Sequence, residues 1–245
     1  MAAKIDLAPK LRPFPDAESL AASLAERIAG EITRLRGAKP RVQLALCGGR
    51  SPVRTYGLLA EKDLPWQQVD LFLTDERCVP ASDPEANAAL LAGIFGSGAA
   101  AAATIHTIPG ELGPQEAASR YQALLEERLE GRFDLVVLGI GEDGHVASLF
   151  PGHRALHAEP TALAVGVEGA PKPPSERVSL TLTALRAAAA TVLIATGSGK
   201  AAALAGALAP PSELVPASLL DRGRLEVFYD REAAAFLPKT DGDGP

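Results

Sequence analysis

A carboxylate and a histidine stand two residues apart in Asp143-Gly144-His145. The pair closely follows residues 133–138, an apolar run with the length and composition of a buried strand. A neighbouring carboxylate can orient an imidazole and make it more basic, and histidine is the commonest general acid or base. The pattern indicates a catalytic pair, although a hydrogen-bonded loop histidine, the commoner case, has the same spacing.

A glycine-rich turn, Gly48-Gly49-Arg50-Ser51, follows the apolar residues 42–46. Two glycines let the backbone approach an anion, the N–H groups at a helix start point toward it, and the arginine adds positive charge. Ser51 and the proline after it suit the N-cap and the first helical position. A capped turn without a ligand explains these residues equally well, so the motif alone leaves anion binding open.

Two more polar clusters follow apolar runs. Asp75 and Arg77 follow residues 69–74, and Lys200 follows residues 191–196 after a Gly-Ser-Gly turn. The carboxyl ends of parallel strands form one edge of an open sheet, and ligands bind there. Ordinary strand-to-helix turns explain any one cluster, but they explain less well why three of the clusters carry a cation. We therefore expect the clusters to meet in one crevice.

Several cofactor and nucleophile motifs are excluded. Residues 139–144 match G-x-G-x-x-G, but Glu142 and Asp143 would repel a pyrophosphate, so we reject a dinucleotide site. The Gly-Lys pair at Lys200 is no Walker A motif, because Ile194 stands where its first glycine belongs. The sequence contains neither G-x-S-x-G nor H-E-x-x-H. We expect no cofactor and no metal.

Strand-like and helix-like segments alternate along the chain. The predicted strands cover residues 42–46, 69–74, 133–138, 161–167, 178–182, 191–196 and 225–228, and the predicted helices cover 16–36, 52–62, 84–95, 114–130 and 200–208. Several strands are apolar on both faces, which is typical of a parallel sheet covered by helices. We predict an α/β fold, a single-domain, open and mostly parallel sheet with helices on both faces. The domain is expected to span residues 1–245, with 238–245 as a flexible tail.

Composition narrows the classes of partner. The 245 residues include 24 Lys and Arg against 30 Asp and Glu, and only 4% are aromatic. A net charge of −6 argues against nucleic acid or an anionic membrane as a partner. Residues 86–110 are uncharged but interrupted, and we predict a helix, a turn and a short strand there rather than a membrane span. Cys47 and Cys78 form no C-x-x-C pair, and no signal segment precedes residue 13, so we expect a cytoplasmic protein with reduced thiols. We expect a monomer and leave an oligomer open.

Taken together, the motifs resemble the 6-phosphogluconolactonase family. The matching segments are LALCGGRSP (44–52), LTDERCVP (73–80), Asn87 in the helix that follows, FDLVVLGIGEDGHVASLFPG (133–152), ERVSLTLTAL (176–185) and TGSGKAAAL (196–204). The resemblance implies hydrolysis of 6-phospho-D-glucono-1,5-lactone to 6-phosphogluconate, the second step of the oxidative pentose phosphate pathway, without a cofactor. It also implies the fold of glucosamine-6-phosphate deaminase and ribose-5-phosphate isomerase.

The resemblance assigns expected roles to particular residues. His145 matches the proposed general base of the family, and Asp143 matches its neighbour. The expected substrate-binding residues are Gly48, Gly49, Arg50, Ser51, Asp75, Arg77, Arg177 and Lys200. A lactone is an ester, so one histidine can activate water and then protonate the leaving ring oxygen.

Two other functions fit this type of chain. A glucosamine-6-phosphate deaminase-like isomerase would have the same fold, but that family has an acid just before the proline that follows D-G-H, where this chain has Phe150. A non-catalytic sugar-phosphate sensor would carry a DNA-binding helix-turn-helix. The residues before 42 leave no room for one.

Overall fold

The computed structural model describes residues 8–238. The tail predicted at 238–245 therefore lies, except for Pro238, outside the described residues. The strands are β1 (Lys10–Phe14), β2 (Val42–Leu46), β3 (Val69–Leu73), β4 (Asp75–Arg77), β5 (Thr104–His106), β6 (Leu135–Gly139), β7 (Ala164–Val167), β8 (Arg177–Leu180), β9 (Thr191–Ala195) and β10 (Leu225–Asp230). The α-helices are α1 (Ala17–Leu35), α2 (Val53–Ala60), α3 (Asn87–Phe95), α4 (Pro114–Arg128), α5 (Leu182–Ala187) and α6 (Ala201–Leu208).

Seven strands form one sheet in the order β1-β10-β9-β6-β2-β3-β5, and every neighbouring pair in it is parallel. All residues of β2, β3, β9 and β10 are buried. A parallel sheet is covered on both faces, so its strands are mainly apolar on both faces rather than alternating. The few charged side chains in these strands, such as Asp70 and Glu226, are buried and paired with arginines. The α/β fold with a mostly parallel sheet, expected from these apolar runs, is confirmed.

The order of the strands reverses at β2. The chain runs outward from β2 to β3 and β5, and then returns to the opposite side of β2 with β6. Just beyond the paired residues, the N–H of Cys47 donates to the carbonyl of Val137 at 3.1 Å, which keeps the two strand ends together. The loops that leave β2 and β6 diverge at this point. Such a switch point opens a crevice at the carboxyl ends of the strands.

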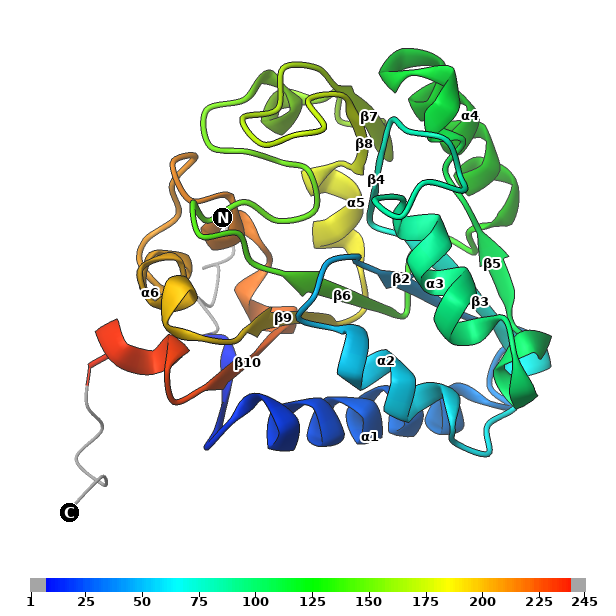
Figure 1. Ribbon diagram of the computed structural model, residues 1–245, viewed down its shortest axis with the longest axis horizontal. Helices are drawn as coiled ribbons and strands as arrows, with labels where there is room; N and C mark the ends of the chain where they lie inside the picture. The colour runs from blue at the N-terminus through cyan, green and yellow to red at the C-terminus, as the bar shows by residue number, and fades with distance from the viewer. Residues whose placement is uncertain (1–7, 239–245) are drawn as a thin grey trace, which may run out of the picture.

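Helix α1 shows how the helices join the sheet. Its N-cap Asp16 accepts a hydrogen bond from the N–H of Ser19 at 2.8 Å. Its buried stripe includes Leu20, Leu24 and Ile28, which repeat at helical spacing. Figure 1 shows α1 and α2 side by side below the central strands of the sheet, and α5 above these strands. Among the described residues, no helix is both long and apolar enough to cross a membrane.

Two predicted strands lie outside the main sheet. The runs predicted at 161–167 and 178–182 form β7 and β8, which pair antiparallel in a separate three-stranded sheet. Its third strand is β4, at residues that the sequence pattern predicts as a turn. The chain turns out of the main sheet after Thr74, whose N–H still bonds to Leu46. Residues 75–77 then pair with β8, and Asp75 and Arg77 face the crevice while Glu76 points the other way, toward α3.

Candidate active site

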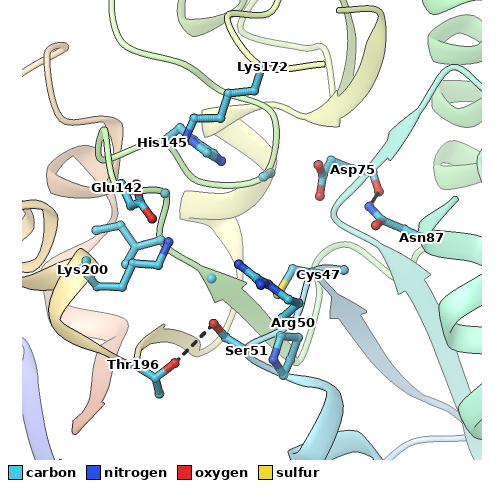
Figure 2. Close-up of a pocket in the computed structure, with 18 of the residues that line it drawn as sticks. Cys47, Arg50, Ser51, Asp75, Asn87, Glu142, His145, Lys172, Thr196 and Lys200 are labelled. Atoms are coloured by element: carbon cyan, nitrogen blue, oxygen red, sulfur yellow. Dashed lines mark hydrogen bonds between the residues drawn. The ribbon is translucent and has the colours of Figure 1, made fainter. Parts of the chain in front are cut away.

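A cavity of about 580 Å³ opens at the switch point. It is lined by the loops after β2 and β6, by β4, by the turn after β9 and by the loop before β8 (Figure 2). Six of its lining residues are cations: Arg50, Arg54, Arg77, Lys172, Arg177 and Lys200. Three are acids: Glu18, Asp75 and Glu142. A cationic cavity in a chain of net charge −6 is suited to an anionic ligand.

His145 and Asp143 form a hydrogen-bonded pair. Nδ1 of His145 lies 2.5 Å from Oδ1 of Asp143, and the imidazole lines the cavity. Because an ionised carboxylate only accepts hydrogen bonds, Nδ1 carries the proton. The Nε2 atom of the neutral ring then keeps its lone pair. The pair therefore has the geometry of an oriented general base.

Backbone hydrogen bonds close the short loop from Gly141 to His145, which carries both residues of the pair. The N–H of Gly141 donates to the carbonyl of His145 at 2.9 Å, and the N–H of Gly144 donates to Gly141 at 3.0 Å. Gly144 has a φ of 84°, which favours glycine, and a Cβ there would lie 2.7 Å from a methyl of Val215. Gly141 and Gly144 thus form a tight turn that presents His145. This turn explains both glycines without a bound dinucleotide.

Burial and charge set the protonation of the pair. Burial lowers the pKa of His145, and the Lys172 ammonium lowers it further, while Asp143 opposes them. Burial alone would raise the pKa of Asp143, but the charge and hydrogen bond of His145, together with Lys172, bring it below its ordinary value. A neutral imidazole beside an ionised carboxylate is therefore the favoured state near neutral pH.

An aromatic ring supports His145 from behind. The ring of Phe150 is fully buried and lies 4.6 Å from the imidazole, measured between centroids. The guanidinium of Arg177 lies 5.5 Å from the same ring. Phe150 therefore fills the space behind the imidazole.

The predicted glycine loop lies in the cavity, and its first glycine makes room for a neighbour. A Cβ on Gly48 would lie 1.8 Å from Oδ1 of Asn87, so only glycine lets that amide reach the backbone carbonyl of Asp75 at 2.8 Å. Gly49 has a φ of 85°, which also favours glycine. Arg50 is exposed at the rim and points into the cavity in Figure 2.

The prediction that Ser51 caps the next helix is wrong. No side chain caps α2, and its N-cap position is occupied by Pro52. The hydroxyl of Ser51 instead accepts a hydrogen bond from Thr196 at 3.3 Å, across the cavity floor (Figure 2). This contact joins the loop after β2 to the turn after β9, two segments that lie far apart in the sequence.

Asp75 lies in the cavity wall but is tied to the protein on both carboxylate oxygens. Ser148 donates to Oδ2 at 2.7 Å and Thr74 donates to Oδ1 at 3.0 Å. The residue is 6% exposed. Asp75 therefore links β4 to the segment after His145, and it presents little free surface to a ligand.

Glu76 has a role that the sequence pattern did not suggest. Its buried carboxylate accepts hydrogen bonds from the N–H groups of Arg77, Asn87 and Ala88 at 2.7–2.8 Å. The last two are the first residues of α3, which explains why this helix begins at residue 87 rather than at the predicted 84. Burial raises the pKa of Glu76, and the three hydrogen bonds oppose that rise.

Arg77 and Lys200, the basic residues expected after two strand ends, differ in how far the protein already binds their charged groups. Arg77 lines the cavity, and its Nη1 donates to the backbone carbonyl of Glu85. Lys200 reaches toward the cavity centre from the opposite side to Arg50 (Figure 2). Burial lowers the pKa of Lys200, an effect that Glu142 opposes. Lys200 is thus a partly desolvated cation placed to meet a ligand.

Arg177 reaches the cavity but also holds its own loop. Its Nε donates to Pro174 at 3.0 Å, and its Nη2 donates to the carbonyls of Lys172 and Pro173 at 3.2 and 3.1 Å. Its Nη1 has no hydrogen-bond partner within residues 8–238. The residue is therefore largely a loop clamp, with one nitrogen left for a ligand.

Sequence reasoning missed four charged residues that line the cavity, namely Glu18, Arg54, Glu142 and Lys172. Lys172 contacts Asp143, and Arg54 forms a double hydrogen bond with Glu18 at the rim. The sequence pattern assigns Glu142 no role beyond repelling a pyrophosphate. A lone lysine between prolines ahead of Arg177 was the one local signal for Lys172. Glu18 and Arg54 lie on α1 and α2, whose approach to the cavity is set by the tertiary fold, whereas Glu142 lies in the predicted loop after β6.

The remaining reactive groups are not arranged for chemistry. Cys47 is buried in the cavity wall, and burial raises the pKa of its thiol to about 12. Cys78 is partly exposed, and its pKa is raised to about 11, again mainly by burial. Within residues 8–238, no group of three or more His, Cys, Asp or Glu side chains is placed to hold a metal ion.

Comparison with known proteins gives consistent matches. The family model of glucosamine-6-phosphate isomerases/6-phosphogluconolactonase matches residues 15–229. A 6-phosphogluconolactonase of Streptomyces coelicolor is 33% identical, with 95% of this chain and 96% of the relative covered. One of Pseudomonas putida is 37% identical, over 84% of this chain and 86% of the relative.

Solved structures show the same likeness. The crystal structure of a 6-phosphogluconolactonase from Shewanella baltica matches with a TM-score of 0.83 and 26% identity, covering 91% of this chain and 97% of that one. A monomeric glucosamine-6-phosphate deaminase matches with a TM-score of 0.74 at 23% identity, covering 92% of this chain and 98% of that one. The second likeness extends to the fold alone.

Proposed function

Because the chain belongs to the family of glucosamine-6-phosphate isomerases and 6-phosphogluconolactonases, we propose that it hydrolyses 6-phospho-D-glucono-1,5-lactone to 6-phosphogluconate by His145-activated water. Relatives at 33–37% identity over most of the chain indicate a lactonase, a hydrolase of cyclic esters. The observation that carries the proposed mechanism is the placement of the His145–Asp143 pair in a cavity rich in cations.

The proposed reaction needs one residue to move protons. Nε2 of His145 takes a proton from a water molecule while the water oxygen attacks the lactone carbonyl carbon. The resulting tetrahedral intermediate expels the ring oxygen, which receives the proton from the imidazolium. The product carboxylic acid then ionises, so each turnover releases one proton. Acid–base help of this kind contributes roughly 10²–10⁴-fold to rate.

Asp143 keeps the imidazole ready for this cycle. Its hydrogen bond to Nδ1 fixes the ring so that Nε2 faces the cavity, and its negative charge stabilises the imidazolium that forms in the reaction. Neither cysteine is a credible nucleophile, because burial holds both thiols protonated at neutral pH. Direct attack by water is therefore the simplest route.

The phosphate of the substrate is proposed to meet Lys200 and the loop at residues 48–51. Lys200 and Arg50 approach each other across this part of the cavity, and the backbone at Gly49 is open, since a Cβ there would touch nothing within 4 Å (Figure 2). A phosphate dianion is well held by cations and backbone N–H groups together. Arg77 and Arg177 remain candidates for the sugar or the phosphate, with part of each guanidinium already bonded to protein carbonyls.

A deaminase-like isomerase is disfavoured by the surroundings of His145. By resemblance, a glucosamine-6-phosphate deaminase would have an acid at the position of Phe150, where this chain has a ring buried against the imidazole. No carboxylate can act from there. A cytoplasmic location, a monomeric state and a single domain over the whole chain stay predictions.

The function is tested by two parallel assays on the purified chain. Proton release from freshly made 6-phospho-D-glucono-1,5-lactone is followed with a pH indicator, and ammonia release is measured from glucosamine 6-phosphate. We expect proton release far above the spontaneous rate and no ammonia. Ammonia release, or lactone opening no faster than without protein, would overturn the proposal.

A further inference from the structure

Lys172 lies beside the His145–Asp143 pair. It belongs to the loop between β7 and β8, whereas the pair lies in the loop after β6. Its Nζ is 3.6 Å from Oδ1 of Asp143, and the same oxygen lies 2.5 Å from Nδ1 of His145. Figure 2 shows the lysine side chain running alongside His145 at the cavity wall. One carboxylate oxygen is thus shared between the imidazole and an ammonium ion.

The backbone that carries this lysine is fixed. Arg177, which is 6% exposed, donates hydrogen bonds to the carbonyls of Lys172, Pro173 and Pro174. A further bond, from the N–H of Ala170 to the carbonyl of Ser175, closes the base of the loop at 2.9 Å. The Lys172 side chain is 44% exposed, so the loop rather than side-chain packing sets where its charge lies.

We propose that Lys172 is a positioning residue whose ammonium, held over Asp143 by the Arg177 clamp, keeps His145 unprotonated and able to act as a base at neutral pH. This inference rests on the proposed function for its catalytic meaning. The electrostatic relationship itself exists in the free protein.

Asp143 has two opposing effects on His145. An ionised Asp143 orients the imidazole, but it also stabilises the imidazolium, which cannot accept a proton from water. The charged groups that act on His145 are Asp143 and Asp75, which favour the protonated ring, and Lys172, which disfavours it in addition to burial. A cation on the far side of the carboxylate offsets part of its attraction while leaving the hydrogen bond in place. A base must be unprotonated at the working pH, and it works best when its pKa lies near that pH.

The kinetic test compares pH profiles of kcat/KM for lactone hydrolysis. Lys172→Met removes the charge at similar side-chain length, and Lys172→Arg keeps it. Lys62→Met is the matched control, because Lys62 pairs with the exposed Glu26 and does not line the cavity. For Lys172→Met we expect the ratio of kcat/KM at about pH 7.5 to that at about pH 5.5 to rise roughly three- to tenfold. Lys172→Arg and Lys62→Met should keep the wild-type ratio.

Two kinetic outcomes contradict the proposal. If Lys172→Met raises KM equally at every pH, the lysine contacts substrate and does not tune the base. If the ratio is unchanged and kcat falls uniformly, its role is structural. A thermal midpoint measured for each variant separates either result from unfolding.

A second readout does not depend on activity. The histidine ring signals are followed by NMR titration of the full chain, and His145 is identified by its absence from His145→Gln. We expect the His145 midpoint to move to higher pH in Lys172→Met and to stay in place in Lys172→Arg. An unmoved midpoint overturns the proposal. A wild-type chain without lactonase activity would instead refute the proposed function, while the titration would still decide the role of Lys172.

Discussion

Gly141 lies against His145 so closely that no side chain fits between them. A Cβ built on Gly141 would lie 2.0 Å from Nδ1 of the imidazole and 2.5 Å from Oδ1 of Asp143. The observed position of the His145–Asp143 pair therefore requires a glycine at residue 141. This close contact explains the second glycine of the G-x-G-x-x-G match without a dinucleotide.

We expect Gly141→Ala to fold and to lose most activity. The added methyl must displace the imidazole or its carboxylate, and a misplacement of about 1 Å costs on the order of a hundredfold in rate. The measurement is kcat for lactone hydrolysis, with circular dichroism to confirm folding. Gly57→Ala is the control, because a Cβ there meets nothing within 4 Å and Gly57 does not line the cavity. Full activity in Gly141→Ala would show that the pair does not need the observed position.

The pH dependence of wild-type kcat/KM follows from the state of His145. Its pKa lies below the ordinary value of about 6.5, chiefly because of burial. The active form is the neutral ring, so activity is retained above that pKa and is lost as the pH falls through it. We expect a plateau at neutral pH and an acidic limb with its midpoint below about pH 6.5. An acidic limb centred above pH 7 would contradict the assigned environment.

Removal of the Lys200 charge should discriminate between substrates. The phosphate does not change in the reaction, so its contacts bind ground state and transition state alike and mainly affect KM. We expect Lys200→Ala to lower kcat/KM for the phosphorylated lactone about ten- to hundredfold, since a charge-assisted hydrogen bond is worth roughly 1.5–3 kcal/mol.

The control for that variant is unphosphorylated glucono-1,5-lactone. Its rate should change little in Lys200→Ala. The same pair of substrates ranks Arg50→Ala and Arg77→Ala. An equal loss on both lactones would place Lys200 at the carbonyl or in folding rather than at the phosphate.

A cluster remote from the cavity should affect stability alone. Asp70 is buried and accepts hydrogen bonds from Arg41 at 2.5 and 2.7 Å, and its Oδ1 lies 3.0 Å from Nε2 of His106. We expect Asp70→Asn to lower the free energy of unfolding by about 1–3 kcal/mol at neutral pH without reducing kcat. The measurement is urea unfolding of both proteins.

The pH dependence of that difference has a defined sign. Burial would raise the pKa of Asp70, but Arg41 and His106 outweigh it and lower the pKa below the unfolded value. The stabilisation is thus present above about pH 4 and is lost as the pH falls through the folded pKa. A difference between wild type and variant that grows toward acid pH would contradict this assignment.

The main strands were predictable because they are buried on both faces. Residues 42–46, 69–73 and 191–195 are mainly apolar, with one polar residue in each, and this composition can be recognised without knowledge of the neighbouring strands. β4 and α5 were not predicted because both are short. The three residues of β4 are all charged, and the six residues of α5 are too few to show helical periodicity. Their conformations depend on pairing with β8 and on the turn at Thr181, which accepts a hydrogen bond from Ala184.

Within the site, the sequence located residues better than it assigned their bonds. His145 and Asp143 are two residues apart, so the sequence indicated that they could pair, and the structure shows their hydrogen bond. Ser51 accepts a hydrogen bond from Thr196, and the side chain of Asn87 occupies the space that a Cβ on residue 48 would fill. These are contacts between distant segments, and their geometry is fixed by strand order, which a local motif does not contain. Arg177 lines the expected cavity, yet three carbonyls of its own loop occupy much of its guanidinium.

The most direct test of the account is the initial rate of proton release from 6-phospho-D-glucono-1,5-lactone with His145→Ala, corrected for spontaneous opening. The wild-type chain should accelerate hydrolysis, and the folded variant should lose about 10²–10⁴-fold in kcat, because it lacks the base that activates water. A folded His145→Ala protein with near-wild-type kcat would contradict the central claim and would move the base to another residue of the cavity.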